Sequence, residues 1–91
     1  MKVIIIEDEK PSARRLQRLL EVLNVKTDVM LHSVEESIEW FNNNAHPDLI
    51  FLDIQLSDGL SFEIFEEIDI KSAIIFTTAY DAYALQAFKL N

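Results

Sequence analysis

The sequence has no cysteine, one glycine and two prolines among its 91 residues. The lack of cysteine excludes disulfides and thiolate metal sites. Glycine and proline are scarce while 49% of the residues are hydrophobic, so the composition is that of a folded chain and not of a disordered tail. The length allows one small domain.

Long hydrophobic runs are absent as well. No apolar stretch approaches the roughly 20 residues that a membrane-spanning helix requires. Met1 and Lys2 are followed by only four apolar residues and then by acids, which does not match a signal peptide. We therefore expect a cytoplasmic protein that makes no membrane contact.

Basic residues are few: 8 lysines and arginines stand against 16 acids, for a formal net charge of −8. A chain this acidic repels phosphate backbones and anionic lipids. We expect no direct nucleic-acid binding by this segment, and we expect its partners to be cations and basic protein surfaces.

Four apolar runs are expected to form strands, at 3–6, 25–31, 48–53 and 73–78. The first is a β-branched run bounded by charge, as is typical of a strand buried on both faces. The second is more mixed in composition, which favours a position at the edge of a sheet.

Signals for a helix follow each run. Pro11 suits the first turn of a helix, and Ser33 with Glu36 forms a capping box that opens the next one. Ser61 is expected to cap a short third helix, and a fourth is expected over 81–89. The resulting βαβαβαβα order predicts an α/β fold, with a parallel sheet covered by helices on both faces.

Glu7, Asp8, Asp53 and Thr78 each lie at the carboxyl end of an expected strand. Ligands of open parallel sheets bind at this edge. Taken singly, an acid after a strand usually caps the next helix, and threonine is a common strand residue. Together, three carboxylates would raise one another's pKa values unless a cation lay between them. An all-oxygen set suits Mg²⁺, and one carboxylate could attack phosphorus to form an aspartyl phosphate.

Three motifs resemble the receiver domain of bacterial two-component response regulators, a family that is itself a known example of ligand binding at this sheet edge. They are Glu7-Asp8 after an apolar run, Asp48-Leu-Ile-Phe-Leu-Asp53 followed by Leu56 and Asp58-Gly59, and Thr78-Ala79 after Ile74-Ile-Phe. The stretch from Thr77 to Phe88 is similar to the subgroup whose members carry a C-terminal LytTR DNA-binding domain. The resemblance covers essentially the whole chain.

The resemblance implies a role for each site residue. Asp53 would accept a phosphoryl group from the phosphohistidine of a sensor histidine kinase. Asp8, Asp53 and, partly through water, Glu7 would hold Mg²⁺, and the backbone carbonyl of Gln55 would complete the coordination. Thr78 would donate a hydrogen bond to the phosphoryl group and act in the switch. The chain would thus be a signalling phosphoacceptor, not an enzyme with a separate substrate.

The resemblance also implies a flavodoxin-like, doubly wound sheet with strand order 2-1-3-4. Family members continue through a fifth βα unit that supplies a lysine and a switch aromatic, whereas this sequence stops at Asn91. We therefore expect residues 1–91 to be a C-terminally truncated receiver domain without its output domain. The run at 73–78 would then be an exposed edge, so we expect self-association through this strand or a domain swap.

Three other functions are weighed against this one. A phosphatase or phosphotransferase with an aspartate nucleophile commonly needs a second acid two residues later, where this sequence has Gln55. A flavodoxin-like nucleotide or flavin module would need a glycine-rich loop, but Gly59 is the only glycine. A receiver-like protein-interaction module that phosphorylation does not switch stays open as the alternative.

Overall fold

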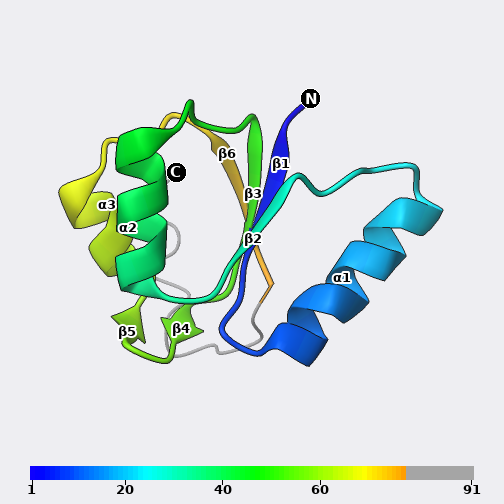
Figure 1. The fold of residues 1–91 in the computed structure, drawn as a ribbon, viewed down its shortest axis with the longest axis horizontal. Coiled ribbons are helices and arrows are strands. Elements are labelled where there is room, and N and C mark those ends of the chain that lie inside the picture. The colour runs from blue at the N-terminus through cyan, green and yellow to red at the C-terminus, as the bar shows by residue number, and fades with distance from the viewer. Residues whose placement is uncertain (78–91) are drawn as a thin grey trace.

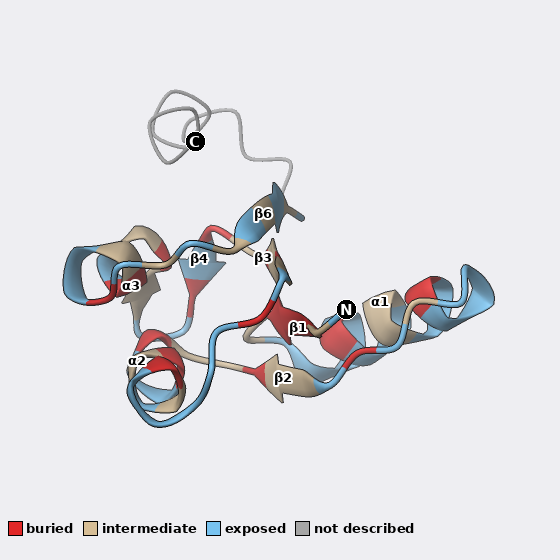
Figure 2. Cartoon of the chain, turned by 90° about the horizontal axis from the view of Figure 1, so that it is seen from above, coloured by how far each residue is buried: buried red, intermediate tan, exposed pale blue. Residues whose placement is uncertain are grey.

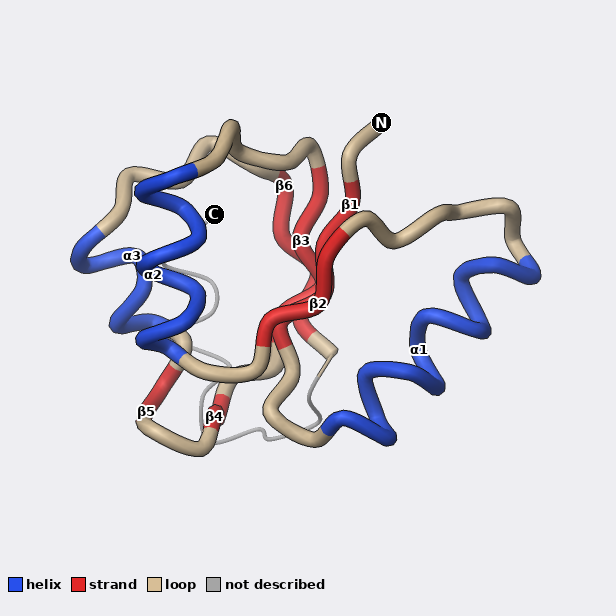
Figure 3. The backbone as a smooth tube through the Cα atoms, viewed as in Figure 1, coloured by secondary structure: helices blue, strands red, loops and turns tan. Residues whose placement is uncertain are grey.

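The computed structural model describes residues 1–77. Its helices and strands alternate along the chain in this order: β1 (Val3–Ile6), α1 (Lys10–Val22), β2 (Val29–Leu31), α2 (Val34–Asn43), β3 (Leu49–Leu52), β4 (Gln55–Leu56), β5 (Gly59–Leu60), α3 (Phe62–Glu67) and β6 (Ala73–Phe76). Strands β2, β1, β3 and β6 form one parallel sheet in that order (Figures 1 and 3). The predicted α/β fold with strand order 2-1-3-4 is confirmed, β6 being the fourth predicted strand.

Helices cover both faces of the sheet. α1 lies on one side, whereas α2 and α3 lie on the other (Figures 1 and 2). Side chains alternate between the two faces, as they must along any strand. Ile4, Ile6 and Ile50 belong to the core beneath α2 and α3, whereas Ile5 packs with Ala13 of α1.

β1 is the most enclosed strand, with all four residues at most 1% exposed. It pairs with β2 on one side and with β3 on the other. Central strands of parallel sheets are hydrophobic on both faces for this reason, and the β-branched run predicts this position correctly. β1 therefore anchors the residues that follow it at the carboxyl edge.

β2 is shorter than predicted, because only the last three residues of the run 25–31 pair with β1. Asn24 adopts a φ of 62°, and the N–H of Val25 donates to the carbonyl of Leu20 at 2.8 Å. Val25 consequently packs against α1 and does not extend the strand. Tertiary packing thus overrides the strand propensity of this residue.

The capping box at the start of α2 is present in a shifted form. The Ser33 hydroxyl accepts from the N–H of Glu36 at 3.0 Å, as predicted. The Glu36 carboxylate accepts from the N–H of His32 at 2.7 Å, one residue earlier than the usual reciprocal bond. The helix start is still correctly predicted.

The prediction that Ser61 caps α3 is wrong. Ser61 precedes the helix, but its backbone is already helical and its hydroxyl makes no capping bond. That hydroxyl is buried and has no hydrogen-bond partner within residues 1–77. Glu63 instead accepts from the N–H of Leu60 at 2.9 Å.

A two-stranded hairpin, β4 with β5, follows β3 and was not predicted. Its turn contains Ser57 and Asp58. Gly59 has a φ of 150°, and a Cβ there would collide with the Glu63 carboxylate. The backbone angle therefore requires glycine, whereas the Glu63 carboxylate ends a flexible side chain and could move aside.

Thr78 and the helix predicted over 81–89 lie outside the described residues. Within residues 1–77, no helix is long and apolar enough to cross a membrane.

Replacing Ile50 by alanine should lower the free energy of unfolding by about 2–5 kcal/mol, because the side chain is fully buried and the cavity would be only partly refilled. Val22 is 80% exposed, so Val22→Ala should change it by less than about 0.5 kcal/mol. Urea unfolding followed by circular dichroism measures both changes. Equal effects of the two substitutions would contradict the assigned core.

Candidate functional site

The acids that follow β1 and β3 emerge at the same edge of the sheet. The two strands pair from Val3 with Leu49 to Ile6 with Leu52, so they end at the same level. The N–H of Asp53 then donates to the carbonyl of Ile6 at 2.9 Å. This bond places Asp53 directly beside the chain that leads into Glu7.

The neighbouring strands extend this edge in the same way. The N–H of Glu7 donates to the carbonyl of Leu31 at 2.9 Å, and the N–H of Thr77 donates to the carbonyl of Leu52 at 3.0 Å. All four strands of the sheet therefore finish around one site, as is usual for open parallel sheets.

Glu7, Asp8 and Asp53 form a cluster in which one carboxylate oxygen of each lies within 4.8 Å of the others. Each of the three residues is partly buried. It is the one group of three or more potential metal-ligating side chains found in the described part of the chain. The sequence-based expectation that these three acids meet is thus met in the structure.

Helix capping does not account for these acids. α1 begins after Glu9, which makes no side-chain capping bond, and neither Glu7 nor Asp8 occupies the cap position. Asp53 is followed by the β4–β5 hairpin and not by a helix. None of the three carboxylates is therefore the cap of a helix, although Glu7 accepts a hydrogen bond from the N–H of Glu9, the residue before α1.

Burial and neighbouring acids raise the pKa of Glu7 from its ordinary value of 4.5 to about 7. Loss of water around the carboxylate is the largest cause, followed by a side-chain contact with Asp8. The N–H of Glu9, which donates to Glu7 at 3.1 Å, acts in the opposite direction, and the negative charge of Asp53 raises the pKa further. The three carboxylates therefore repel one another when they are charged, and a bound cation would relieve this repulsion.

The residues present fit a hard divalent cation. Three carboxylates supply oxygen ligands only, with no nitrogen or sulfur donor among them. Mg²⁺ is commonly bound by a few carboxylates together with water. The donor set and the raised pKa of Glu7 therefore both favour a magnesium site.

A hollow of about 270 Å³ opens beside the cluster. Its lining comes from the acidic edge and from α1: Glu7, Thr77, Ser12, Arg15, Leu16 and Leu19. Arg14, Arg15 and Arg18 are exposed on α1, and Arg15 places a positive charge at this rim.

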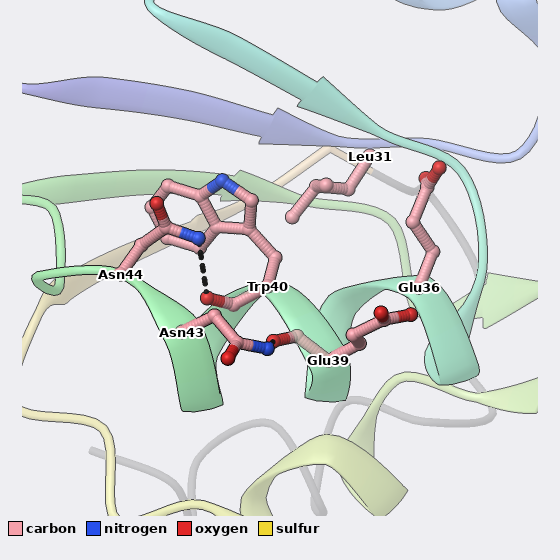
Figure 4. Close-up of a pocket in the computed structure, with 6 residues that line it drawn as sticks. All are labelled: Leu31, Glu36, Glu39, Trp40, Asn43 and Asn44. Carbon is pink, nitrogen blue, oxygen red and sulfur yellow. Dashed lines mark hydrogen bonds between the residues drawn. The ribbon is translucent and has the colours of Figure 1, made fainter.

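A second hollow, of about 510 Å³, lies between α2 and the end of β2 and contains none of the clustered acids (Figure 4). Trp40 forms part of its lining. The indole packs edge-on against Phe41, with ring centroids 5.2 Å apart, and the Lys2 ammonium lies 4.9 Å from the indole centroid. Trp40 is therefore a packing residue.

Two residues near the site make contacts that the sequence does not predict, one with the backbone of Glu7 and the other with α2. His32 donates from Nδ1 to the backbone carbonyl of Glu7 at 2.9 Å. Asp58, at the tip of the hairpin, accepts from two N–H groups of α2. Asp58 belongs to the Asp-Gly motif quoted above, but nothing in the sequence indicates a contact with a helix that starts 24 residues earlier.

Gln55 lies in β4, two residues beyond Asp53, and pairs with Leu60. Its side chain is exposed, and the role of its backbone carbonyl as a ligand stays a prediction. Thr78 lies outside the described residues, so its role stays a prediction as well.

Comparisons with known proteins identify the same kind of domain. The sequence model of the family described as "Response regulator receiver domain" matches residues 3–91. The chain is 41% identical to the sensory transduction protein LytT of Bacillus anthracis, covering all of this chain and 38% of that protein. It is 37% identical to the transcriptional regulatory protein LytR of Staphylococcus aureus, again over 38% of that protein. The chain thus spans about two fifths of the length of these relatives.

Solved structures give the same result. The receiver domain of Erythrobacter litoralis PhyR has a TM-score of 0.71 and 29% identity, covering 97% of this chain and 70% of that one. A two-component response regulator from Clostridium difficile has a TM-score of 0.72 and 28% identity, covering 98% of this chain and 75% of that one.

Without a bound cation, stability should fall as pH rises. Between the ordinary pKa of 4.5 and the raised pKa of about 7, the folded protein keeps a proton on Glu7 that the unfolded chain has lost. The stabilisation is therefore complete below the lower value and is lost as pH rises through the higher one. Glu7→Gln cannot titrate, so its free energy of unfolding should decline less than that of the wild type over this range.

Urea unfolding in EDTA at several pH values measures this difference. Glu66→Gln, at an exposed position of α3, is the control and should follow the wild type. If the free energy of unfolding depends on pH in the same way in the wild type and in Glu7→Gln, the pKa of Glu7 is not raised by folding.

Proposed function

The chain belongs to the response regulator receiver domain family, and on that premise we propose that Asp53 accepts a phosphoryl group from the phosphohistidine of a sensor histidine kinase. The observation that carries the proposal is the convergence of Glu7, Asp8 and Asp53 at the carboxyl edge of the sheet. A magnesium ion would be held by these three residues and by the backbone carbonyl of Gln55.

Asp53 is the best nucleophile of the three acids. Glu7 accepts a hydrogen bond from Glu9 and is half protonated near pH 7, which reduces its nucleophilicity. Asp8 is adjacent to Glu7 in the same loop, so the pair is suited to holding a cation from one side. Asp53 comes from the neighbouring strand and is left to react.

The transfer is a displacement at phosphorus. One carboxylate oxygen of Asp53 forms a bond to phosphorus while the bond between phosphorus and the histidine nitrogen breaks. The electron pair of that bond returns to the imidazole, which takes a proton from solvent. When bound, Mg²⁺ neutralises the negative charge of the phosphoryl oxygens. Water later hydrolyses the aspartyl phosphate, so the only reactions catalysed are the domain's own phosphorylation and dephosphorylation.

The phosphoryl group would act as a switch. We propose that Thr78 donates a hydrogen bond to it, which favours one arrangement of the nearby chain over another. One relative is named as a transcriptional regulatory protein, and this supports transcription control as the output. With a net charge of −8, residues 1–91 would act as a cytoplasmic receiver domain and leave DNA contact to another domain.

Incubation with acetyl phosphate and Mg²⁺ should add one phosphoryl group to the wild type, as measured by intact-mass spectrometry. Asp53→Asn and EDTA should each abolish the addition. Asp8→Asn should weaken Mg²⁺ binding first and lower the labelling as a consequence. Asp69→Asn is the matched control, since this aspartate is 83% exposed and pairs only with Lys71 among the described residues.

Equal labelling of wild type and Asp53→Asn would exclude Asp53 as the acceptor. No labelling of a folded wild type would instead favour the protein-interaction module that phosphorylation does not switch.

We also propose that the chain self-associates through β6 or exchanges elements between copies. Among the described residues, β6 pairs on one side only, with β3, and Ile75 is 48% exposed. An apolar edge strand is a template for pairing with another chain.

Ile75→Lys should therefore shift the chain toward monomer in light scattering at high micromolar concentration. Leu23→Lys, at a 71% exposed position just after α1, should leave the association unchanged. A wild type that is monomeric at this concentration would contradict self-association.

A further inference from the structure

Asp58 caps a helix that is distant in sequence. Its Oδ1 accepts from the N–H of Val34 at 2.8 Å, and its Oδ2 accepts from the N–H of Glu35 at 3.0 Å. The next N–H, that of Glu36, donates to Ser33 at 3.0 Å. The first three N–H groups of α2 are thus satisfied, two of them by a single carboxylate that lies 24 residues further along the chain.

The carboxylate is held in its charged form. Loss of water acts to raise the pKa of Asp58, but the hydrogen bonds from the N–H groups of Glu35 and Val34 outweigh it and leave the pKa below its ordinary value. A negative charge at this position also interacts favourably with the positive end of the helix dipole. The contact is therefore a charge-assisted pair of bonds and not an incidental approach.

Asp58 lies at the tip of the hairpin that directly follows Asp53. Figure 1 shows β4 and β5 beneath the first turn of α2. At the base of the hairpin, the N–H of Ser61 donates to the carbonyl of Ile54 at 2.8 Å. This bond closes the hairpin at its base, so Gln55 lies between the closed base and the tip that Asp58 ties to α2.

The first turn of α2 is in turn tied to the other side of the acidic cluster. The residue before Ser33 is His32, whose Nδ1 donates to the carbonyl of Glu7 at 2.9 Å. A chain of contacts therefore runs from Glu7 through the start of α2 to Asp58 and on to the segment that carries Asp53. These contacts connect the loop after β1, which carries Glu7 and Asp8, with the segment after β3, which carries Asp53.

We infer that Asp58 is a positioning residue of the acidic site: by fixing the hairpin to the first turn of α2, it holds the Asp53–Gln55 segment in the conformation that binds Mg²⁺. The inference rests on the proposed function, because it assigns to Asp58 an effect on the same site. Asp58 does not belong to the carboxylate cluster and would act only through the backbone that it holds.

Four variants of the 91-residue chain separate positioning from helix capping and from charge. Asp58→Ala removes both bonds to α2, and Asp58→Asn keeps one acceptor oxygen. Ser33→Ala uncaps the same helix end without touching the hairpin. Glu35→Gln removes one charge from the same helix turn and leaves its N–H in place.

Titration calorimetry with MgCl₂ gives the affinity of each variant. Asp58→Ala should weaken Mg²⁺ binding by about tenfold, the usual effect of losing a residue that orients metal ligands, with Asp58→Asn intermediate. Ser33→Ala and Glu35→Gln should change it by less than about twofold. Exchange of the Ser61 amide hydrogen, measured by NMR, should accelerate in Asp58→Ala and not in Ser33→Ala.

Unchanged affinity in Asp58→Ala, or an equal loss in Ser33→Ala or Glu35→Gln, would overturn the inference and leave the proposed function intact. If Asp58→Ala does not fold, Asp58→Asn provides the test: weaker Mg²⁺ binding would support the inference, and unchanged affinity would overturn it. A wild type whose Mg²⁺ binding is absent, or is unaffected by Asp53→Asn, would overturn the proposed function and this inference with it.

Discussion

The register between β1 and β3 is the constraint on which the site depends. Pairing of Ile6 with Leu52 ends the two strands at one level, so Glu7, Asp8 and Asp53 have to emerge side by side. A shift by one residue would turn Ile50 and Leu52 of β3 away from the core beneath α2 and α3 and would move Asp53 away from Glu7. The free energy that buries these strands thus also keeps Glu7 partly buried and close to Asp8 and Asp53, and this burial and these neighbours raise its pKa.

The rest of the described fold supports this edge from both faces. α1 packs on one face through Ala13 and Leu20, and α2 and α3 pack on the other. The hairpin after Asp53 is tied to α2 by Asp58, and α2 is tied to Glu7 by His32. The acidic loops are therefore supported by hydrogen bonds between side chains and the backbone, as a site requires if its ligand oxygens are to be in place before a cation binds.

The fold and the three carboxylates are predictable from sequence because both depend on local patterns. Apolar runs that end in acids define parallel strands and the edge at which ligands bind. The β4–β5 hairpin and the Asp58 cap are not predictable, because a two-residue strand has no periodicity and a cap from 24 residues away leaves no local signal. The prediction that Ser61 caps α3 is wrong although a serine before the helix is the usual local signal. The Ser61 hydroxyl is buried without a partner among the described residues, and the Glu63 carboxylate accepts from the N–H of Leu60 instead.

The central claim is that burial and the neighbouring acids keep a proton on Glu7 until a cation binds. Titration calorimetry with MgCl₂ at about pH 6.5, repeated in buffers of different ionisation enthalpy, counts the protons released on binding. Glu7, with a pKa raised to about 7, should release a large fraction of one proton, and Glu7→Gln should release none from this position. Binding of Mg²⁺ to the wild type with no proton release would contradict the account.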